Sequence, residues 1–321
     1  MEVWEAVWSL LSIIIYSILS TFVFIFLLAL IIRIISFNKL KTKRNPIIKS
    51  ELIKKKMFKT SDGYELRWFG EINPNSEYII IGIHDMFRNR KDFDKMQIWL
   101  SKNKKSNCSL VSFDQRNCGE NIVEKQFHFG WTVSDLKEIV EDISEKNSKS
   151  KIILLGEGFG STIASFLSDN EKVHKIISCS LRLNDAYQKT FGFYLKLWWG
   201  TLFKANTKLI SSINGLDLTD DSNFAKKIED ENITKNLFNV KDYYLWKKSN
   251  RISIKNLNKS KEKILLILSN NDFYCNSKKI AKYLSKLNKD KYILEKVKGY
   301  KHYILNTKDS EKIFDLIIKS L

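Results

Sequence analysis

The feature that most constrains this chain is a run of 27 residues without a charged side chain, from Ala6 to Ile32. A helix of about 20 apolar residues crosses the hydrocarbon core of a bilayer, so this run is long enough to span a membrane. Trp4 precedes the run and Trp8 lies near its start, where aromatic rings favour the membrane–water interface. The sequence therefore predicts an N-terminal transmembrane helix over residues 6–32.

The residues around the run distinguish an anchor from a signal peptide. A cleaved signal peptide has a basic segment, a shorter apolar core and a cleavage site made of small residues. Here the preceding segment carries Glu2 and Glu5 but no lysine, and no A-x-A motif follows the run. We therefore expect an anchor that is not removed.

Basic side chains directly after the run predict its orientation. They are Arg33, Lys39, Lys41, Lys43 and Arg44, followed by Lys54, Lys55 and Lys56. Because lysine and arginine stay on the cytoplasmic side, we expect a single-pass cell-membrane protein with its N-terminus outside and its large domain in the cytoplasm. A basic tether over residues 33–56 would be attracted to anionic lipid headgroups. Four cysteines without a C-x-x-C pair fit a reducing compartment.

The net charge of +18 raises the question of nucleic-acid binding. The basic residues are 46 scattered lysines and only 8 arginines, without a compact arginine–aromatic cluster, which is typical of a solvated surface. Nucleic acid is therefore not the expected partner, and a steep salt dependence of binding would be needed to revive a role in binding nucleic acid or anionic lipid. No G-x-x-x-x-G-K-[ST] loop or zinc-ribbon cysteine spacing occurs, and we expect neither a cofactor nor a metal ion.

From residue 57 to residue 321 the chain alternates short apolar runs with helical segments. A hairpin with Asp62-Gly63 as its turn comes first, and residues 131–146 predict a helix capped by Thr132 or Ser134. Strands separated by helices of 10–15 residues indicate an α/β fold with a mostly parallel central sheet. The predicted buried strands are residues 77–84, 108–114, 151–158, 175–181, 263–270 and 291–297.

The alternation stops at about residues 182–260, which read as an inserted helical cap over the carboxyl edge of the sheet. The segment FYLKLWWGTLF within it is apolar and aromatic. Such a cap either covers a lipid-sized pocket or packs as a helical lid on the core, and the sequence leaves both open.

Chemistry in a parallel sheet lies at the carboxyl ends of its strands, and five such ends carry distinctive segments. They read HDMFRNR (84–90), FDQRNCGEN (113–121), LLGEGFGS (154–161), SNNDFYCN (269–276) and KGYKHYIL (298–305). In this order they resemble the α/β-hydrolase superfamily, most of all its monoacylglycerol lipase and lysophospholipase branch. The resemblance covers residues 57–321 and implies an α/β-hydrolase fold with flanking helices and a cap.

The resemblance breaks at the nucleophile. Aligning G-x-S-x-G on residues 156–160 places Gly158 where the family has its serine, and glycine has no side chain to attack a carbonyl. The family's acid and base correspond to Asp272 and His302, which would form a pair without a serine to activate. Such a pair is either a residual acid–base device or a hydrogen bond kept for structure.

A second departure lies at His84-Asp85, where the family has His-Gly. The resemblance assigns the oxyanion-hole donors to the backbone N–H groups of Met86 and Phe159, and an aspartate in this loop puts their geometry in doubt. His84 itself reads as a structural histidine.

Other residues are weaker candidates for chemistry. Ser161 lies three positions beyond Gly158 and would serve as a substitute nucleophile only if the turn were remodelled. Cys179 and Cys275 read as a core and a loop thiol, and His128 and His174 as solvent-facing side chains.

Two functions follow from these observations. The first is a membrane-anchored pseudoenzyme that lacks the serine at Gly158 and binds a lipid or a protein partner through its former active site; the identity of a protein partner is unknown. The alternative is an active lipid esterase of the lysophospholipase type, which uses a displaced nucleophile or a water activated by Asp272 and His302.

Overall fold

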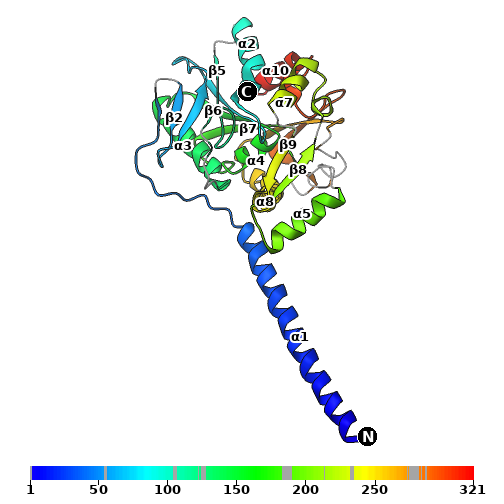
Figure 1. The fold of residues 1–321 in the computed structure, drawn as a ribbon. Helices are drawn as coiled ribbons and strands as arrows, with labels where there is room; N and C mark the ends of the chain where they lie inside the picture. Colours follow the sequence, from blue (N-terminus) through cyan, green and yellow to red (C-terminus); the bar gives the residue numbers. More distant parts are fainter. Residues whose placement is uncertain are drawn as a thin grey trace.

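The computed structural model describes residues 2–53, 56–103, 107–121, 123, 128–182, 190–212, 214–231, 235–272, 274, 282, 284–285 and 288–321. Helix α1 (Glu2–Phe37) projects from the rest of the chain as a long stalk (Figure 1). Its residues Val3–Phe37 are long and apolar enough to cross a membrane. It contains residues 6–32 and continues into the basic segment that follows them.

Nine strands form the central sheet of the described chain, in the order β1-β2-β3-β5-β4-β6-β7-β10-β11. β1 to β3 pair antiparallel, and β3 pairs antiparallel with β5. All later neighbours are parallel, which is the mostly parallel sheet that the sequence predicts. The strands are β1 (Glu51–Ile53), β2 (Met57–Lys59), β3 (Glu65–Phe69), β4 (Tyr78–Ile83), β5 (Cys108–Phe113), β6 (Lys151–Glu157), β7 (Val173–Cys179), β10 (Ile264–Ser269) and β11 (Tyr292–Val297).

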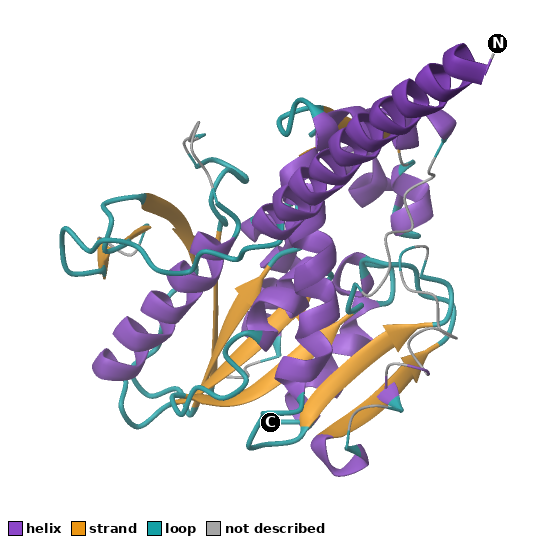
Figure 2. Ribbon diagram, turned by 90° about the horizontal axis from the view of Figure 1, so that it is seen from below, coloured by secondary structure: helices purple, strands orange, loops and turns teal. Residues whose placement is uncertain are grey.

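The central strands are continuously apolar because helices cover both faces of the sheet (Figure 2). In β4, Ile79, Ile81 and Ile83 join the core on the side of α3 (Gly130–Lys146) and α4 (Phe159–Ser165). Ile80 faces the other way, into the core formed with α2 (Asp94–Lys102) and α10 (Ser310–Lys319). This alternation follows from the two-residue period of a strand and gives three layers. Short 3-10 turns, η1 (Arg90–Phe93), η2 (Lys289–Lys291) and η3 (Ile304–Asn306), complete the domain.

The cap lies between β7 and β10. It contains α5 (Phe191–Leu202), α6 (Gly215–Leu218), α7 (Ser222–Asp230) and α8 (Val240–Leu257). It also contains an antiparallel pair, β8 (Lys208–Ser212) with β9 (Lys235–Asn239), which the sequence did not predict. Asn250 of α8 accepts a hydrogen bond from the Thr162 hydroxyl of α4, so the cap is joined to the helix that follows β6.

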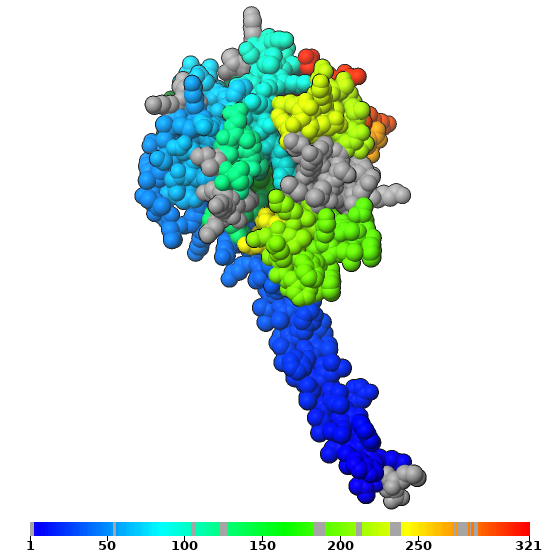
Figure 3. Space-filling model, viewed as in Figure 1, coloured from blue at the N-terminus to red at the C-terminus, as the bar shows by residue number. Residues whose placement is uncertain are grey.

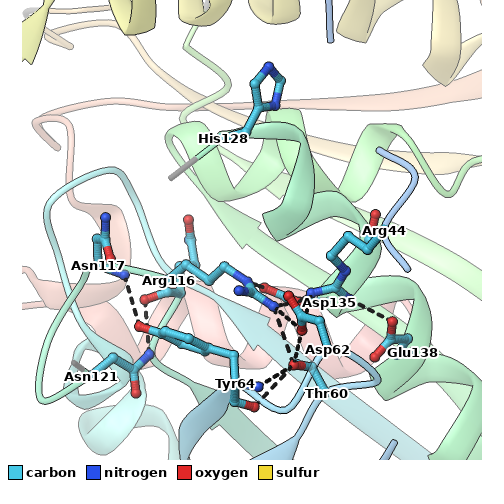
Figure 4. A network of polar contacts seen from close by, with 12 residues as sticks. Arg44, Thr60, Asp62, Tyr64, Arg116, Asn117, Asn121, His128, Asp135 and Glu138 are labelled. Carbon is cyan, nitrogen blue, oxygen red and sulfur yellow. Dashed lines mark hydrogen bonds and ion pairs between the residues drawn. The ribbon is translucent and has the colours of Figure 1, made fainter. Parts of the chain in front are cut away.

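The segment between α1 and β1 is fixed to the domain. Arg44 forms ion pairs with Asp62, Asp135 and Glu138, and its side chain is only 4% exposed. Arg116 pairs with Asp62 and Asp135 from the other side, so the two guanidinium groups share a carboxylate network (Figure 4). The buried network ties the chain that leaves α1 to the start of α3.

Two expectations about this region were wrong. His128 is buried, not solvent-facing, because the chain after α1 covers it and the Lys39 carbonyl oxygen lies 3.1 Å from its Nε2 atom. Burial is the main cause that lowers the pKa of His128. Helix α3 begins at Gly130 after Phe129, without a side-chain cap, so neither Thr132 nor Ser134 caps it. The Ser134 hydroxyl instead donates to the Thr42 carbonyl oxygen. His174, in β7, is half-buried.

Candidate active site

Four of the strand ends that the sequence singled out meet at one edge of the sheet. The loops after β4, β6, β10 and β11 bring together Asp85, Gly158, Asp272 and His302. Parallel strands place their carboxyl ends at the same edge, which is why residues so distant in sequence become neighbours.

Gly158 occupies the sharp turn between β6 and α4 with φ of 56° and ψ of −116°. Residues other than glycine rarely adopt this conformation, and in hydrolases of this fold such a turn carries the nucleophile. Gly160 allows the close approach of the turn to β4, since a Cβ atom there would overlap the Ile83 carbonyl oxygen. This strand-to-helix turn, called the elbow below, is therefore formed, although its central residue, Gly158, has no side chain.

The Asp85 carboxylate fills the space where a side chain on Gly158 would lie. A Cβ atom built on Gly158 would be 2.6 Å from Oδ1 and 2.7 Å from Oδ2 of Asp85. Real Cβ atoms do not make contacts this short, so serine at position 158 and the present position of Asp85 exclude each other.

One oxygen of Asp85 binds both backbone groups that the resemblance assigns to the oxyanion hole. The N–H of Met86 donates to Oδ1 at 2.8 Å, and the N–H of Phe159 donates to the same oxygen at 2.6 Å. Two convergent backbone donors are the arrangement that stabilises a developing oxyanion. Here a permanent carboxylate oxygen of the chain occupies them.

The other oxygen of Asp85 faces the histidine. Nε2 of His302 lies 3.1 Å from Oδ2, and the Tyr303 hydroxyl donates to the same oxygen at 3.3 Å. Nδ1 of His302 lies 2.9 Å from both carboxylate oxygens of Asp272. His302 is thus held between two carboxylates, and Asp85 takes the hydrogen bond that a serine hydroxyl would make.

The charges of the site reinforce this arrangement. Burial would lower the pKa of His302, but Asp272 and Asp85 outweigh it and raise that pKa to about 9. Burial would raise the pKa of Asp85, but the Arg182 guanidinium, His302 and the Phe159 N–H outweigh it and hold that pKa well below its usual range. At neutral pH a histidine cation therefore lies between carboxylates.

Sequence reasoning did not find Arg182, which lies at the start of the cap. Its Nη1 atom is 3.5 Å from Oδ1 of Asp85, and its guanidinium carbon lies 3.7 Å from the ring centre of Tyr274. The side chain is 2% exposed. In a chain with 46 lysines and 8 arginines, an arginine directly after a buried strand is the signal that could have drawn attention to it.

The substitute nucleophile is directed elsewhere. The Ser161 hydroxyl donates to the carbonyl oxygens of Gly156, at 2.7 Å, and Cys179, at 3.1 Å. These bonds hold it against β6 and β7, inside the protein. Cys179 is buried in the core, and Cys275 lies outside the described residues.

Two further buried polar residues, His84 and Glu157, lie next to the site in sequence and make hydrogen bonds of their own. His84 is buried, accepts a hydrogen bond from the Gln115 N–H at 2.9 Å through Nε2, and contacts the Asp85 carbonyl oxygen through Nδ1. Glu157, just before the elbow, accepts a hydrogen bond from the Leu305 N–H at 3.0 Å. Burial is the main cause that raises the pKa of Glu157 to about 8.

Met86 and Phe159, whose backbone groups bind Asp85, also line a cavity of about 240 Å³. Its walls are mainly apolar, with Asp242 of α8 as a carboxylate among them. Burial raises the pKa of Asp242 to about 6. The lining residues are Met86, Phe87, Gln115, Arg116, Asn117, Cys118, Phe129, Thr132, Phe159 and Asp242. Within the described part of the chain, no group of three or more His, Cys, Asp or Glu side chains could hold a metal ion.

Solved structures share this fold over most of the chain. A monoacylglycerol lipase from Paleococcus ferrophilus superposes with a TM-score of 0.64 and 15% identity, covering 80% of this chain and 98% of its own. A soluble variant of the Saccharomyces cerevisiae monoglyceride lipase, in complex with a substrate analogue, gives 0.68 and 13%, covering 87% and 96%. An esterase from Exiguobacterium antarcticum gives 0.57 and 11%, covering 83% and 98%. The predicted α/β-hydrolase fold is therefore confirmed.

Sequence comparison assigns the family. No curated protein sequence matches the chain. The sequence model of the family described as "Serine aminopeptidase, S33" matches residues 95–309, about two thirds of the chain. This range includes Gly158, Asp272 and His302 and begins after Asp85. With this match and the fold, the chain belongs to the serine aminopeptidase S33 family of α/β-hydrolases.

Proposed function

We propose that this chain is a membrane-anchored member of its family that has lost ester hydrolysis and binds a single-chain lipid beside its former active site. The observation that carries the proposal is the Asp85 carboxylate, which fills both the side-chain space at Gly158 and the two backbone donors. The chain thus supplies its own occupant for the catalytic centre.

Acyl transfer by this fold needs three things that the site does not offer together. It needs a nucleophile, and Gly158 has none. It needs free donors for the oxyanion, and the N–H groups of Met86 and Phe159 are bound to Asp85. It needs a neutral histidine as base, and a pKa of about 9 keeps His302 protonated at neutral pH.

Helix α1 supports the membrane anchor. Its charge-free run and its length suit a bilayer, and its apolar side chains are exposed. Lys39, Lys41 and Lys43 follow it with exposed side chains, at the level where anionic headgroups would attract them. The basic residues favour an external N-terminus and a cytoplasmic domain.

The cavity next to Met86 and Phe159 is the proposed lipid site. Its volume of about 240 Å³ lies below the range of roughly 300–1,000 Å³ for drug-sized ligands, so it suits one short acyl segment rather than a two-chain lipid. Two charged groups line the cavity, the Asp242 carboxylate and the Arg116 guanidinium, and the guanidinium is already paired with Asp62 and Asp135. The Asp242 carboxylate therefore disfavours a fatty-acid anion and favours a neutral headgroup such as glycerol. Structural relatives named as monoacylglycerol lipases support the same ligand class.

An active hydrolase is the second candidate, and the intact contact between Asp272 and His302 favours it. A water beside His302 would need the position that Asp85 holds. Asp85 could itself attack a substrate, because carboxylates serve as enzyme nucleophiles. Its full burial and its contact with Arg182 argue against that role.

The test uses the purified full-length chain with a monoacylglycerol. We expect bound lipid by native mass spectrometry and no release of fatty acid. Cys118→Phe, which fills the cavity, should abolish the bound lipid, whereas the matched control Cys118→Ser should retain it. Equal lipid binding by the wild type and both variants would show that the lipid does not bind in this cavity.

Hydrolysis by the wild type would overturn the loss of activity, and variants would then identify the nucleophile. Activity lost in Asp85→Asn would assign the attack to Asp85. Activity lost in His302→Ala but retained in Asp85→Asn would assign it to an activated water. Serine labelling by a fluorophosphonate that disappears in Ser161→Ala would assign it to Ser161.

A further inference from the structure

Helix α5 of the cap carries apolar side chains on both its packed and its exposed face, with Lys196 as its one charged residue. One face packs on the cap: Phe193, Gly200 and Thr201 are buried, and a Cβ atom on Gly200 would overlap the Val240 side chain at the start of α8. Phe193 also meets the Tyr243 ring edge-on at 5.6 Å. A helix that needs only this face for packing would carry polar residues on the other.

The outward face of α5 instead gathers large apolar side chains. Each of them is more than half exposed, and they are spaced three or four residues apart along one side of the helix. They are Phe191, Tyr194, Leu195, Trp198, Trp199 and, directly after the helix, Phe203. Contiguous apolar surface of this kind marks an interaction site rather than ordinary solvent-facing surface.

This face lies beside the end of the proposed anchor. α5 contacts both α1 and α8. In Figure 1, α5 lies to one side of the upper end of α1 and is steeply inclined to it, and the space-filling view shows the α5 region directly against the upper end of the stalk (Figure 3). The junction is fixed, since Phe37 of α1 packs on Tyr244 of α8 and the Lys248 ammonium donates to the Asn38 carbonyl oxygen at 2.8 Å.

We propose that the exposed face of α5 lies in the headgroup region of the bilayer that α1 spans, as a second membrane contact. The proposal rests on the membrane anchor in the proposed function. Its occupant is the lipid surface, because the apolar faces of α1 and α5 adjoin each other at the level where the span leaves the membrane.

The depth of α5 agrees with this placement. Arg33 is the first charged residue after the apolar run, and Phe37 follows one helical turn later, about 6 Å along the axis. The border of the hydrocarbon core therefore lies close to the level at which α1 meets the cap. Tryptophan and tyrosine favour this interfacial zone, and the exposed Lys196 and Lys204 can extend toward anionic headgroups.

A contact between α5 and the membrane would place the proposed lipid cavity close to the bilayer from which its lipid would come. α5 packs on α8, and the first turn of α8 carries Asp242, which lines that cavity. An α5 helix held in the interface would fix the cap and orient this side of the domain toward the membrane.

The test is photo-crosslinking of the full-length chain in vesicles of phosphatidylcholine and phosphatidylglycerol. Benzoylphenylalanine replaces one residue at a time: Trp198 or Tyr194 on the exposed face of α5, Phe24 in α1, or Ile98 on α2. Ile98 is the matched control, because it is 55% exposed and apolar but lies on a helix far from α1 (Figure 1). Mass spectrometry then identifies lipid adducts.

We expect lipid adducts at Trp198 and Tyr194 in a yield close to that at Phe24 and several-fold above that at Ile98. Adducts at Phe24 without adducts on α5 would overturn this inference and leave the anchor intact. Adducts on α5 without any at Phe24 would support the surface contact and refute the spanning anchor. A crosslink from Trp198 to a second copy of the chain would show that the face is a dimer interface and would overturn the inference.

Discussion

The Asp85 carboxylate occupies the space that a side chain on Gly158 would fill, since a Cβ atom on Gly158 would lie 2.6 Å from Oδ1 of Asp85. The two departures from the family pattern are therefore a single structural replacement. A side chain from the loop after β4 takes the place of one from the loop after β6. It also reproduces the contacts of a bound oxyanion with Met86 and Phe159.

Gly158→Ser alone is expected to remain inactive and to destabilise the protein. The new side chain must displace Asp85, and overpacking of a filled interior costs about 1–3 kcal/mol. Asp85→Gly together with Gly158→Ser should restore hydrolysis of a short-chain ester, because it frees the oxyanion donors and supplies the hydroxyl. Ester turnover and thermal unfolding of the full-length chain measure the two effects.

Asp85→Gly alone is the control for that pair, since it empties the oxyanion hole without adding a nucleophile. It should stay inactive. If Gly158→Ser were active by itself, Asp85 would have to be easily displaced, and our account of the blocked site would be wrong.

His302 should lose much of its basicity when Asp85 becomes neutral. Asp85 and Asp272 both raise its pKa, to about 9, so Asp85→Asn removes one of the two causes and the pKa should fall toward its ordinary value of 6.5. NMR titration of isotope-labelled histidine follows this directly and needs no enzyme activity. Gln115→Ala serves as the control, because it removes a side-chain amide that donates to the His84 carbonyl oxygen and not to His302, and it should leave the His302 titration in place.

In the reactivated double variant, Asp85→Gly with Gly158→Ser, the loss of the Asp85 charge should also set the pH dependence of ester hydrolysis. The rate of ester hydrolysis should rise with pH as His302 becomes neutral. It should reach its plateau below pH 9, because the Asp85 carboxylate no longer stabilises the protonated form of His302. A plateau reached only above pH 9 would show that Asp85 does not control the histidine.

Much of the fold could be predicted from the sequence because burial on both sides leaves continuous apolar runs. Strands such as β4 and β6 lie where those runs predict them. The β8–β9 pair was missed because its short segments, Lys208–Ser212 and Lys235–Asn239, lie within the region that read only as a helical insertion. His128 was misjudged because the chain after α1 covers it, and no local pattern records that contact.

In the candidate site, too, single residues could be recognised from the sequence, whereas their contacts across the fold could not. Gly158 and Asp85 could each be recognised as departures by alignment with a motif. That one substitutes for the other depends on the packing of two loops across the sheet edge. The contribution of Arg182 depends on its distance of 3.5 Å from Asp85, which the sequence does not encode locally.

Raising the pH should destabilise the fold through Glu157. Its folded pKa is raised to about 8 from 4.5, so the stabilisation is present below pH 4.5 and is lost as the pH rises through 8. His302 acts in the same direction between 6.5 and about 9. Each group contributes at most about 1.4 kcal/mol per pH unit.

Glu157→Gln isolates the contribution of Glu157 to the pH dependence of the unfolding free energy. Glutamine keeps the acceptor for the Leu305 N–H but does not ionise, so the loss of unfolding free energy between neutral pH and pH 8 should be smaller than in the wild type. Thermal or denaturant unfolding at a series of pH values measures the slope. Identical slopes in the two proteins would contradict the raised pKa.

Arg44 should stabilise the domain through its buried ion pairs with Asp62, Asp135 and Glu138. Arg44→Ala removes a guanidinium that is 4% exposed, while Arg116 still pairs with Asp62 and Asp135. We therefore expect a loss of about 2–3 kcal/mol, less than when a buried charge is left wholly unpaired.

Lys49→Ala is the matched control, because the Lys49 side chain is 82% exposed and its contact with Glu145 is 4.0 Å long. Such surface pairs contribute about 0–1 kcal/mol. Unfolding of the detergent-solubilised chain measures both losses, and trypsin cleavage at Lys39, Lys41 and Lys43 should accelerate in Arg44→Ala as the segment detaches from α3. Equal stability losses in the two variants, with unchanged cleavage, would mean that the Arg44 network does not hold the segment after α1 on the domain.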